Sequence, residues 1–245
     1  MPSLSSMAAN TITITSADDI ELSTLRHQPP SRKNPWMAID GRRAIIAPIV
    51  VRRSRASQWR DEPFATGYRR PPMQDVLSRA NLIRAVIFDV DGVLTDGSLY
   101  LGDDGQEYKA FHSRDGHGMV MLRDSGVVLG VITGRRSEVV RIRMESLGIS
   151  HVYQGRRDKL PAYEELKQAL DLNDGQLAYV GDDVVDLPIL RRAGLAIAVA
   201  DAHPLVIEHS HWCTQAPGGR GAAREVCELI LRAQGTLDAA LARYF

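Results

Sequence analysis

Residues 85–97 read AVIFDVDGVLTDG, and this stretch decides the fold. Its first four residues, Ala85 to Phe88, form a short apolar run that predicts a buried strand. Asp89 ends that strand and Asp91 follows two residues later. One carboxylate can attack phosphorus while the other moves the proton of the leaving group. The stretch predicts a phosphoryl-transfer site, although an isolated D-x-D-G is more simply interpreted as a solvated acidic turn.

Strand-like and helix-like segments alternate through the chain after this stretch. Further strands are expected at residues 127–132, 151–153, 177–180 and 195–199. Helices are expected at residues 118–125, 137–147, 160–170, 187–192 and 222–241. This order predicts an α/β fold with a mostly parallel sheet. Ligands of such sheets bind at the carboxyl ends of the strands, where the polar motifs of this chain fall.

One segment breaks the alternation. Residues 98–101 and 106–111 flank a Gly-Asp-Asp-Gly turn at 102–105, which is typical of a β-hairpin. A hairpin inserted after the first strand would project over the strand ends. We expect it to act as a flap or as a contact element.

Three further polar motifs follow strands or precede helices. Thr133 ends the second strand, and its hydroxyl can bind a phosphate oxygen. Lys159 lies just before a helix, where its charge can hold both a nucleophile and a phosphate. Residues 181–186 read GDDVVD, and Asp182 is the first of three aspartates in this stretch. Their carboxylates offer the hard oxygen ligands that suit Mg²⁺. Together with Asp89, these motifs favour a phosphatase site.

Composition restricts the function class further. The chain has 245 residues, of which 44% are hydrophobic and 24% are charged, and its formal net charge is zero. Residues 81–245 carry 18 Lys and Arg against 23 Asp and Glu, so nucleic acid is not the expected partner. The apolar run at 44–51 is too short to cross a bilayer. We expect a cytoplasmic protein with two reduced cysteines and no membrane partner.

The chain changes character near residue 80. Residues 1–80 are rich in Pro, Ser and Arg and show no sustained apolar period. Such a segment cannot bury enough surface to offset its ordering entropy, so we expect a disordered N-terminal extension and a folded domain at 81–245. A basic targeting or docking arm, or translation that begins at Met73, are the alternatives.

The four polar motifs resemble the four motifs of the haloacid dehalogenase superfamily. The resemblance implies a Rossmann-like core, bound Mg²⁺ and an aspartyl-phosphate intermediate on Asp89. The metal would be held by Asp89, the backbone carbonyl of Asp91 and Asp182, with Asp183 and Asp186 orienting them. The short spacing between the motifs implies a member without a large cap domain, in which the hairpin is the only insert.

Within that superfamily, residues 82–235 closely resemble 3-deoxy-D-manno-octulosonate 8-phosphate phosphatases. The matching stretches are residues 89–97, 109–111, 114–116, 132–135, 153–155, 158–160, 179–186, 198–204, 218–221 and 224–227. The resemblance implies Mg²⁺-dependent hydrolysis of this phosphorylated sugar acid during lipopolysaccharide core biosynthesis.

The resemblance also implies a substrate-binding set and an assembly. The implied substrate contacts are Asp91, His112, Ser113, Arg114, Asp115, Gly116, Arg135, Arg143, Lys159 and Arg220. A homotetramer is implied, in which four hairpins join and each site is closed by a neighbour's C-terminal segment, which carries Arg220. A phosphatase for another phosphorylated sugar acid, or a non-catalytic regulatory module of the same fold, are the alternatives.

Overall fold

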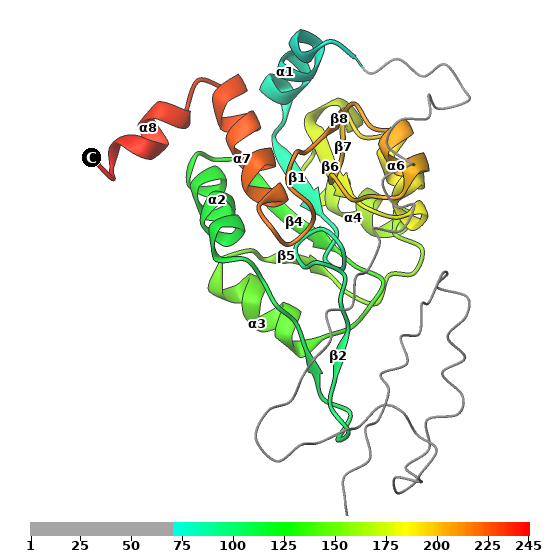
Figure 1. Ribbon diagram of the computed structural model, residues 1–245. Helices are drawn as coiled ribbons and strands as arrows, with labels where there is room; N and C mark the ends of the chain where they lie inside the picture. The colour runs from blue at the N-terminus through cyan, green and yellow to red at the C-terminus, as the bar shows by residue number, and fades with distance from the viewer. Residues whose placement is uncertain (1–70) are drawn as a thin grey trace, which may run out of the picture. The chain divides into compact units, whose positions relative to one another are not determined.

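The structure, a computed structural model, describes residues 71–245 (Figure 1). It confirms the predicted α/β class: one six-stranded sheet has the order β5-β4-β1-β6-β7-β8, and its neighbouring strands are parallel. These strands are β1 (Ala85–Phe88), β4 (Val128–Ile132), β5 (His151–Tyr153), β6 (Leu177–Gly181), β7 (Leu195–Ala198) and β8 (Trp212–Cys213). No helix in this part of the chain is long and apolar enough to span a membrane.

Strand β1 lies in the middle of the sheet, and all four of its residues are buried. It pairs with β4 on one side and with β6 on the other, which explains why its sequence is an unbroken apolar run. The register places Phe88, the last residue of β1, level with Val180 of β6. The polar residues that follow β1, β4 and β6 therefore leave the sheet at the same edge.

Helices cover the sheet and join its parallel strands. They are α1 (Met73–Leu82), α2 (Ser113–Asp124), α3 (Glu138–Ser146), α4 (Leu160–Ala169), α5 (Leu187–Leu190), α6 (Pro204–Glu208), α7 (Ala222–Ala233) and α8 (Leu237–Ala242), with 3₁₀ turns η4 (Asp174–Gln176) and η5 (Val184–Asp186). Helix α7 packs against both α1 and α2 (Figure 1). Its buried residues include Val226, Cys227 and Ile230, so the last long helix completes the core.

The folded domain begins earlier than the predicted boundary at residue 81. Helix α1 occupies Met73–Leu82, and Val76 and Ala80 are buried in the core together with Ile83, which follows the helix. The spacing of these three residues is that of one helical face, and it was hidden by the prolines at 71 and 72. The prediction of disorder is therefore wrong for residues 73–80. Residues 1–70, to which the same prediction applies, lie outside the described residues.

The single helix expected over residues 222–241 is also wrong, because the chain breaks after α7. Gly235 has φ of +69°. The Gly235 N–H donates to the carbonyl of Arg232 at 3.1 Å, and the Thr236 N–H donates to that of Leu231 at 2.9 Å. This is the Schellman pattern that ends helices at a glycine. A separate short helix, α8, follows.

The predicted hairpin is present as β2 (Tyr100–Leu101) and β3 (Glu107–Tyr108), which pair antiparallel. It extends away from the sheet as a narrow two-stranded arm (Figure 1). Tyr100, Leu101 and Tyr108 are each at least half exposed. Between β1 and α2 the described chain holds this arm and no larger insert, which agrees with the expected absence of a cap domain there.

Replacement of Val76 by alanine tests the revised domain boundary. The side chain is 1% exposed in the core, so we expect the free energy of unfolding to fall by roughly 2 kcal/mol. Urea unfolding with an unchanged m-value is the measurement. Met73→Ala is the matched control on the same helix, because Met73 is 52% exposed and its loss should cost less than about 0.5 kcal/mol. Equal stability of the two variants would show that α1 is not part of the domain.

Candidate active site

The predicted nucleophile lies in a buried charge cluster. Asp89 leaves the end of β1 only 5% exposed, and Lys159 Nζ lies 2.9 Å from its Oδ1. Lys159 is itself 4% exposed and also lies 2.7 Å from Asp186 Oδ1. Burial alone would lower the pKa of Lys159, but the two carboxylates outweigh it and raise that pKa, so the ammonium stays charged. Asp89 and Lys159 thus form a buried ion pair at the end of β1.

Asp186 fixes the position of the groups in this cluster. Its side chain is fully buried and accepts hydrogen bonds from Lys159, from the Tyr179 hydroxyl at 2.6 Å, and from the backbone N–H of Asp182 at 3.0 Å and of Asp183 at 3.3 Å. Both oxygens of Asp186 are therefore already occupied by donors. Its role is to position the lysine and the acidic turn, which is what the family resemblance implies for this residue.

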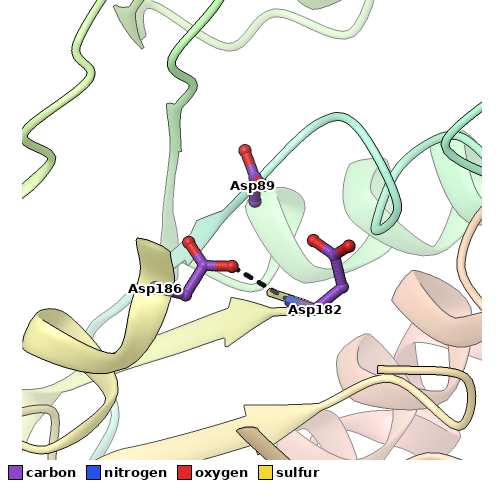
Figure 2. A group of neighbouring side chains, drawn as sticks. All are labelled: Asp89, Asp182 and Asp186. Carbon is purple, nitrogen blue, oxygen red and sulfur yellow. Dashed lines mark hydrogen bonds between the residues drawn. The ribbon is translucent and has the colours of Figure 1, made fainter. Parts of the chain in front are cut away.

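Asp182 contributes a third carboxylate to this cluster. Carboxylate oxygens of Asp89, Asp182 and Asp186 lie within 4.8 Å of one another, and Figure 2 shows the three side chains gathered at the ends of β1 and β6. Burial and the negative charges of Asp89 and Asp186 raise the pKa of Asp182. Burial also raises the pKa of Asp89, against the opposing effect of Lys159. The cluster thus has more negative charge than one lysine neutralises.

These residues fit a bound Mg²⁺. Asp182 Oδ1 is buried and has no hydrogen-bond partner among the described residues. An unpaired buried carboxylate oxygen is costly, and a divalent cation with hard oxygen ligands would satisfy it. Gly92 packs so closely against the Asp182 carboxylate that a Cβ there would overlap it, and its φ of +93° favours glycine. Asp89 and Asp182 are the side chains that would hold the ion.

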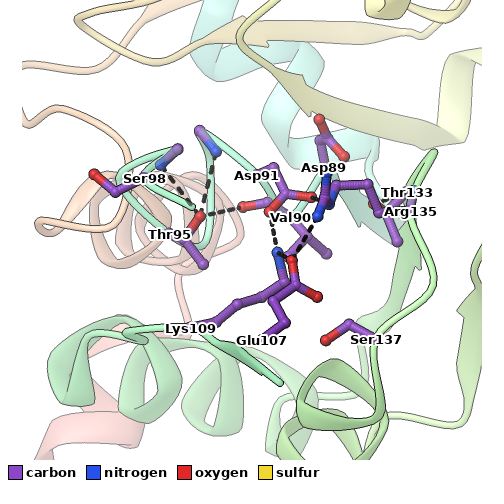
Figure 3. A network of polar contacts seen from close by, with 12 residues as sticks. Asp89, Val90, Asp91, Thr95, Ser98, Glu107, Lys109, Thr133, Arg135 and Ser137 are labelled. Carbon is purple, nitrogen blue, oxygen red and sulfur yellow. Dashed lines mark hydrogen bonds and ion pairs between the residues drawn. The ribbon is translucent and has the colours of Figure 1, made fainter. Parts of the chain in front are cut away.

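Asp91 lies on the other side of the nucleophile, in a second charge network (Figure 3). Its Oδ1 is ion-paired with Lys109, and its Oδ2 lies 4.0 Å from Arg135 Nε. Glu107 bridges the two cations, because its Oε1 lies 3.2 Å from Lys109 Nζ and 2.8 Å from a terminal nitrogen of Arg135. The hairpin therefore contributes side chains to the site, which sequence reasoning missed: Lys109 was part of a matching stretch but had no predicted role.

Two threonines fix the polar loops around the nucleophile. Thr133 follows β4 and is 2% exposed, and its Oγ1 accepts a hydrogen bond from the backbone N–H of Arg135 at 3.3 Å. Thr95 Oγ1 donates to the carbonyl of Val90 at 3.3 Å and accepts from the N–H of Gly97 at 3.3 Å, which closes the loop after Asp89. Thr133 thus lies where it was predicted, beside Asp89 (Figure 3).

The predicted sugar-binding residues divide into two groups. Phe111, His112, Gly116 and Arg143 are among the residues that line a small pocket between the start of α2 and helix α3. Arg143 lies directly over Gly116 and forms no ion pair with any described residue. His112 Nδ1 is buried and has no hydrogen-bond partner among the described residues. Because His112 Nδ1 lies 3.9 Å from Asp115 Oδ2, the Arg143 guanidinium is the group at this pocket wall that is better placed to bind an anionic or polar ligand.

Asp115 also lines this pocket but is held by the start of α7, whereas Ser113 and Arg114 do not line it. Asp115 is 2% exposed, and its two oxygens accept the backbone N–H groups of Gly221 at 3.1 Å and Arg224 at 2.8 Å. Its carboxylate therefore fixes the start of α7. Ser113 and Arg114 are exposed on the first turn of α2.

Arg220 pairs within its own chain. A terminal nitrogen of its guanidinium lies 3.0 Å from Asp96 Oδ2. The preceding glycines bring this segment against the nucleophile loop, since a Cβ on Gly218 would overlap the carbonyl of Gly92. Arg220 thus lies at the loop that carries Asp89 and Asp91 without a second copy of the chain being present.

Two histidines outside the charge cluster have structural roles. His211 Nδ1 accepts the backbone N–H of Ala196 at 2.9 Å, which ties the segment before β8 to β7. His117 forms an edge-to-face contact with Tyr244, with ring centroids 5.3 Å apart.

Comparisons with known proteins agree with this geometry. Residues 128–225 match the family model for haloacid dehalogenase-like hydrolases. A relative named 3-deoxy-D-manno-octulosonate 8-phosphate phosphatase KdsC from Yersinia pestis is 50% identical over 170 residues, which cover 69% of this chain and 91% of the relative. The chain belongs to the haloacid dehalogenase-like hydrolase family. The phosphatase of the same name from Escherichia coli K12 is 48% identical over 170 residues, which cover 69% of this chain and 90% of that one.

Solved structures of family members share the fold. A 3-deoxy-D-manno-octulosonate 8-phosphate phosphatase from Moraxella catarrhalis, solved with magnesium ion, phosphate ion and KDO, is 42% identical. It superimposes with a TM-score of 0.70 over 71% of this chain and 100% of that one. A probable YrbI family phosphatase from Pseudomonas syringae is 53% identical, with a TM-score of 0.69 over 70% of this chain and 97% of that one. The predicted family and fold are confirmed.

Asp186→Asn tests the anchoring role of this carboxylate. The variant keeps the side-chain shape but turns one acceptor into a donor, which then faces either Lys159 and Tyr179 or the N–H groups of Asp182 and Asp183. We expect the free energy of unfolding to fall by about 2 to 4 kcal/mol, measured by urea unfolding. Asp183→Asn is the control, since asparagine accepts the capping bond from the next N–H as well as aspartate does. Equal stability of the two variants would remove the anchoring role.

Proposed function

We propose that this protein is a Mg²⁺-dependent phosphatase that hydrolyses 3-deoxy-D-manno-octulosonate 8-phosphate to the free sugar acid and phosphate, in lipopolysaccharide core biosynthesis. The observation that carries the proposal is the buried Asp89 carboxylate, held by Lys159 at 2.9 Å beside the unpaired oxygen of Asp182. The half-identical relatives that bear this enzyme's name support the choice of substrate.

The first half of the reaction transfers the phosphoryl group to the protein. An Asp89 oxygen attacks phosphorus and forms an acyl phosphate, while the bond from phosphorus to the sugar oxygen breaks. Protonated Asp91 gives its proton to that leaving oxygen, so the sugar departs as a neutral alcohol. Lys159 keeps the attacking carboxylate in place, and Thr133 offers its hydroxyl to a phosphate oxygen.

The second half returns the enzyme to its starting state. Asp91, now a carboxylate, takes a proton from water as the water oxygen attacks phosphorus. The bond between Asp89 and phosphorus breaks, which releases inorganic phosphate and restores the free carboxylate. Lys159 stays paired with Asp186 throughout, so the regenerated nucleophile faces the same ammonium.

Mg²⁺, held by Asp89, Asp182 and the backbone carbonyl of Asp91, would neutralise negative charge on the phosphoryl oxygens and on the two carboxylates. Two features of the protein support this arrangement. They are the buried acid cluster and the close approach of Gly92 to Asp182. A site with this excess of carboxylate charge would otherwise repel a phosphate dianion.

Recognition of the sugar acid is proposed to use the donors near the pocket at α2 and α3. Arg143 has a free guanidinium there, and arginine pairs well with a carboxylate. Arg135 lies beside the Asp91 network and can reach hydroxyl or carboxylate oxygens of the same ligand. His112, Ser113, Arg114, Asp115, Gly116, Lys159 and Arg220 complete the predicted set.

The homotetramer and the cytoplasmic location stay predictions. The arm made by β2 and β3 supports assembly, because Leu99, Tyr100, Leu101 and Tyr108 are about half exposed or more on a two-stranded hairpin that is only marginally stable alone. Closure of each site by a neighbour's C-terminal segment would add contacts to those that Arg220 makes within one chain. Sedimentation of the purified protein measures the state of assembly.

A phosphate-release panel with and without Mg²⁺ tests the proposed function. We expect 3-deoxy-D-manno-octulosonate 8-phosphate to give the highest kcat/KM among phosphorylated sugars and sugar acids. Chelation should abolish turnover and Mg²⁺ should restore it. Asp89→Asn is the control for contaminating phosphatase, since an amide cannot form the acyl phosphate.

Two outcomes of the panel would change the account. Higher kcat/KM for a different phosphorylated sugar acid would replace the proposed substrate while the chemistry stands. Absence of phosphate release from every compound in the presence of Mg²⁺ would favour the non-catalytic alternative.

A further inference from the structure

The base of the hairpin places a buried ammonium beside the proposed general acid. The Lys109 side chain is 1% exposed, and its Nζ is paired with Asp91 Oδ1 and with Glu107 Oε1 at 3.2 Å. A buried lysine is costly unless its charge is compensated, and here two carboxylates compensate it. The lysine therefore has a defined position, because leaving these two carboxylates would strip its own buried charge of both partners.

The strand geometry explains how the hairpin reaches the site. Successive side chains of a strand point to opposite faces, so Glu107 and Tyr108 of β3 take opposite faces, and Lys109, which directly follows β3, lies with Glu107. Tyr108 is 58% exposed and pairs across the hairpin with Tyr100. The polar face of the same short strand is turned toward Asp91 (Figure 3).

The contacts close into a ring of alternating charge. Lys109 joins Asp91 to Glu107, Glu107 binds Arg135 at 2.8 Å, and Arg135 Nε returns to within 4.0 Å of Asp91 Oδ2. The two oxygens of Asp91 thus have unequal surroundings. Oδ1 is held by Lys109, whereas Oδ2 lies beyond hydrogen-bond distance of Arg135.

We propose that Lys109 is a positioning residue that fixes the Asp91 side chain for proton transfer to the leaving oxygen, and that Glu107 holds Lys109 in turn. The proposal rests on the proposed function, in which Asp91 is the general acid. The carbonyl oxygen of protonated Asp91 accepts from Lys109 while its other oxygen donates the proton to the sugar oxygen as the bond to phosphorus breaks. Lys109 itself gives up no proton.

This role has a chemical signature that a purely structural role lacks. A sugar alkoxide is a poor leaving group and needs the proton, whereas the weakly basic p-nitrophenolate leaves without it. Loss of Asp91 positioning should therefore slow phosphorylation of Asp89 by a sugar phosphate and spare phosphorylation by p-nitrophenyl phosphate. Misfolding or loss of Mg²⁺ would slow both to the same extent.

The experiment compares single-turnover rates for the two substrates in Lys109→Met, which keeps the side-chain length without the charge. We expect a roughly 10- to 100-fold loss of the single-turnover rate with the sugar phosphate, part of the ~10²–10⁴-fold effect of general acid–base catalysis. The rate with p-nitrophenyl phosphate should change by less than about 3-fold. Lys167→Met is the matched control, because Lys167 also pairs with two carboxylates, Glu164 at 2.9 Å and Asp174 at 2.8 Å, far from Asp91 in the sequence.

Asp91→Asn separates failure of this inference from failure of the proposed function. If Asp91→Asn slows both substrates equally, the general-acid role itself is wrong. If Asp91→Asn is selective but Lys109→Met is unchanged or slows both substrates equally, the positioning role is wrong.

A milder variant decides the matter if Lys109→Met does not fold. Glu107→Gln keeps the shape of the anchor and weakens its hold on Lys109, so it should give a smaller loss that is again confined to the sugar phosphate. An equal loss on both substrates, or none, would overturn the proposal.

Discussion

The structure depends on one buried ammonium that is shared by two carboxylates. Lys159 lies 2.9 Å from Asp89 and 2.7 Å from Asp186, and all three side chains are almost completely buried. A buried charge is tolerated only when it is paired, so removal of Lys159 would leave two buried carboxylates uncompensated. Asp186 is fixed by further donors, and it therefore sets the position of Lys159 and, through it, of the nucleophile.

The parallel sheet makes this arrangement accessible to a substrate. β1 and β6 pair in register, so Asp89 and Asp182 emerge together at the carboxyl edge, where a ligand can bind. The hairpin adds a second layer on the same edge. Its polar face holds Asp91 through Lys109, and its other face carries exposed tyrosines. The proposed nucleophile and the proposed general acid are thus held by lysines from different parts of the chain.

Much of this site could be predicted from the sequence because its parts are local. Asp89, Thr133 and Asp182 directly follow strands, and an apolar run fixes where a strand ends. The surroundings of Asp115 and Lys109 could not be predicted in this way. Asp115 binds the start of α7, more than 100 residues later in the chain, and Lys109 reaches Asp91 only because the hairpin turns back toward the sheet. Helix α1 was missed because its three core residues follow a long segment without a pattern.

A crystal structure with Mg²⁺ and beryllium fluoride, a mimic of an acyl phosphate, is the most direct test of the central arrangement. We expect density for beryllium trifluoride bonded through beryllium to an Asp89 oxygen, an ion that contacts Asp89 and Asp182, and Lys159 still paired with Asp186. Density bonded to a different side chain, or Lys159 turned away from Asp186 when the ion is bound, would contradict it.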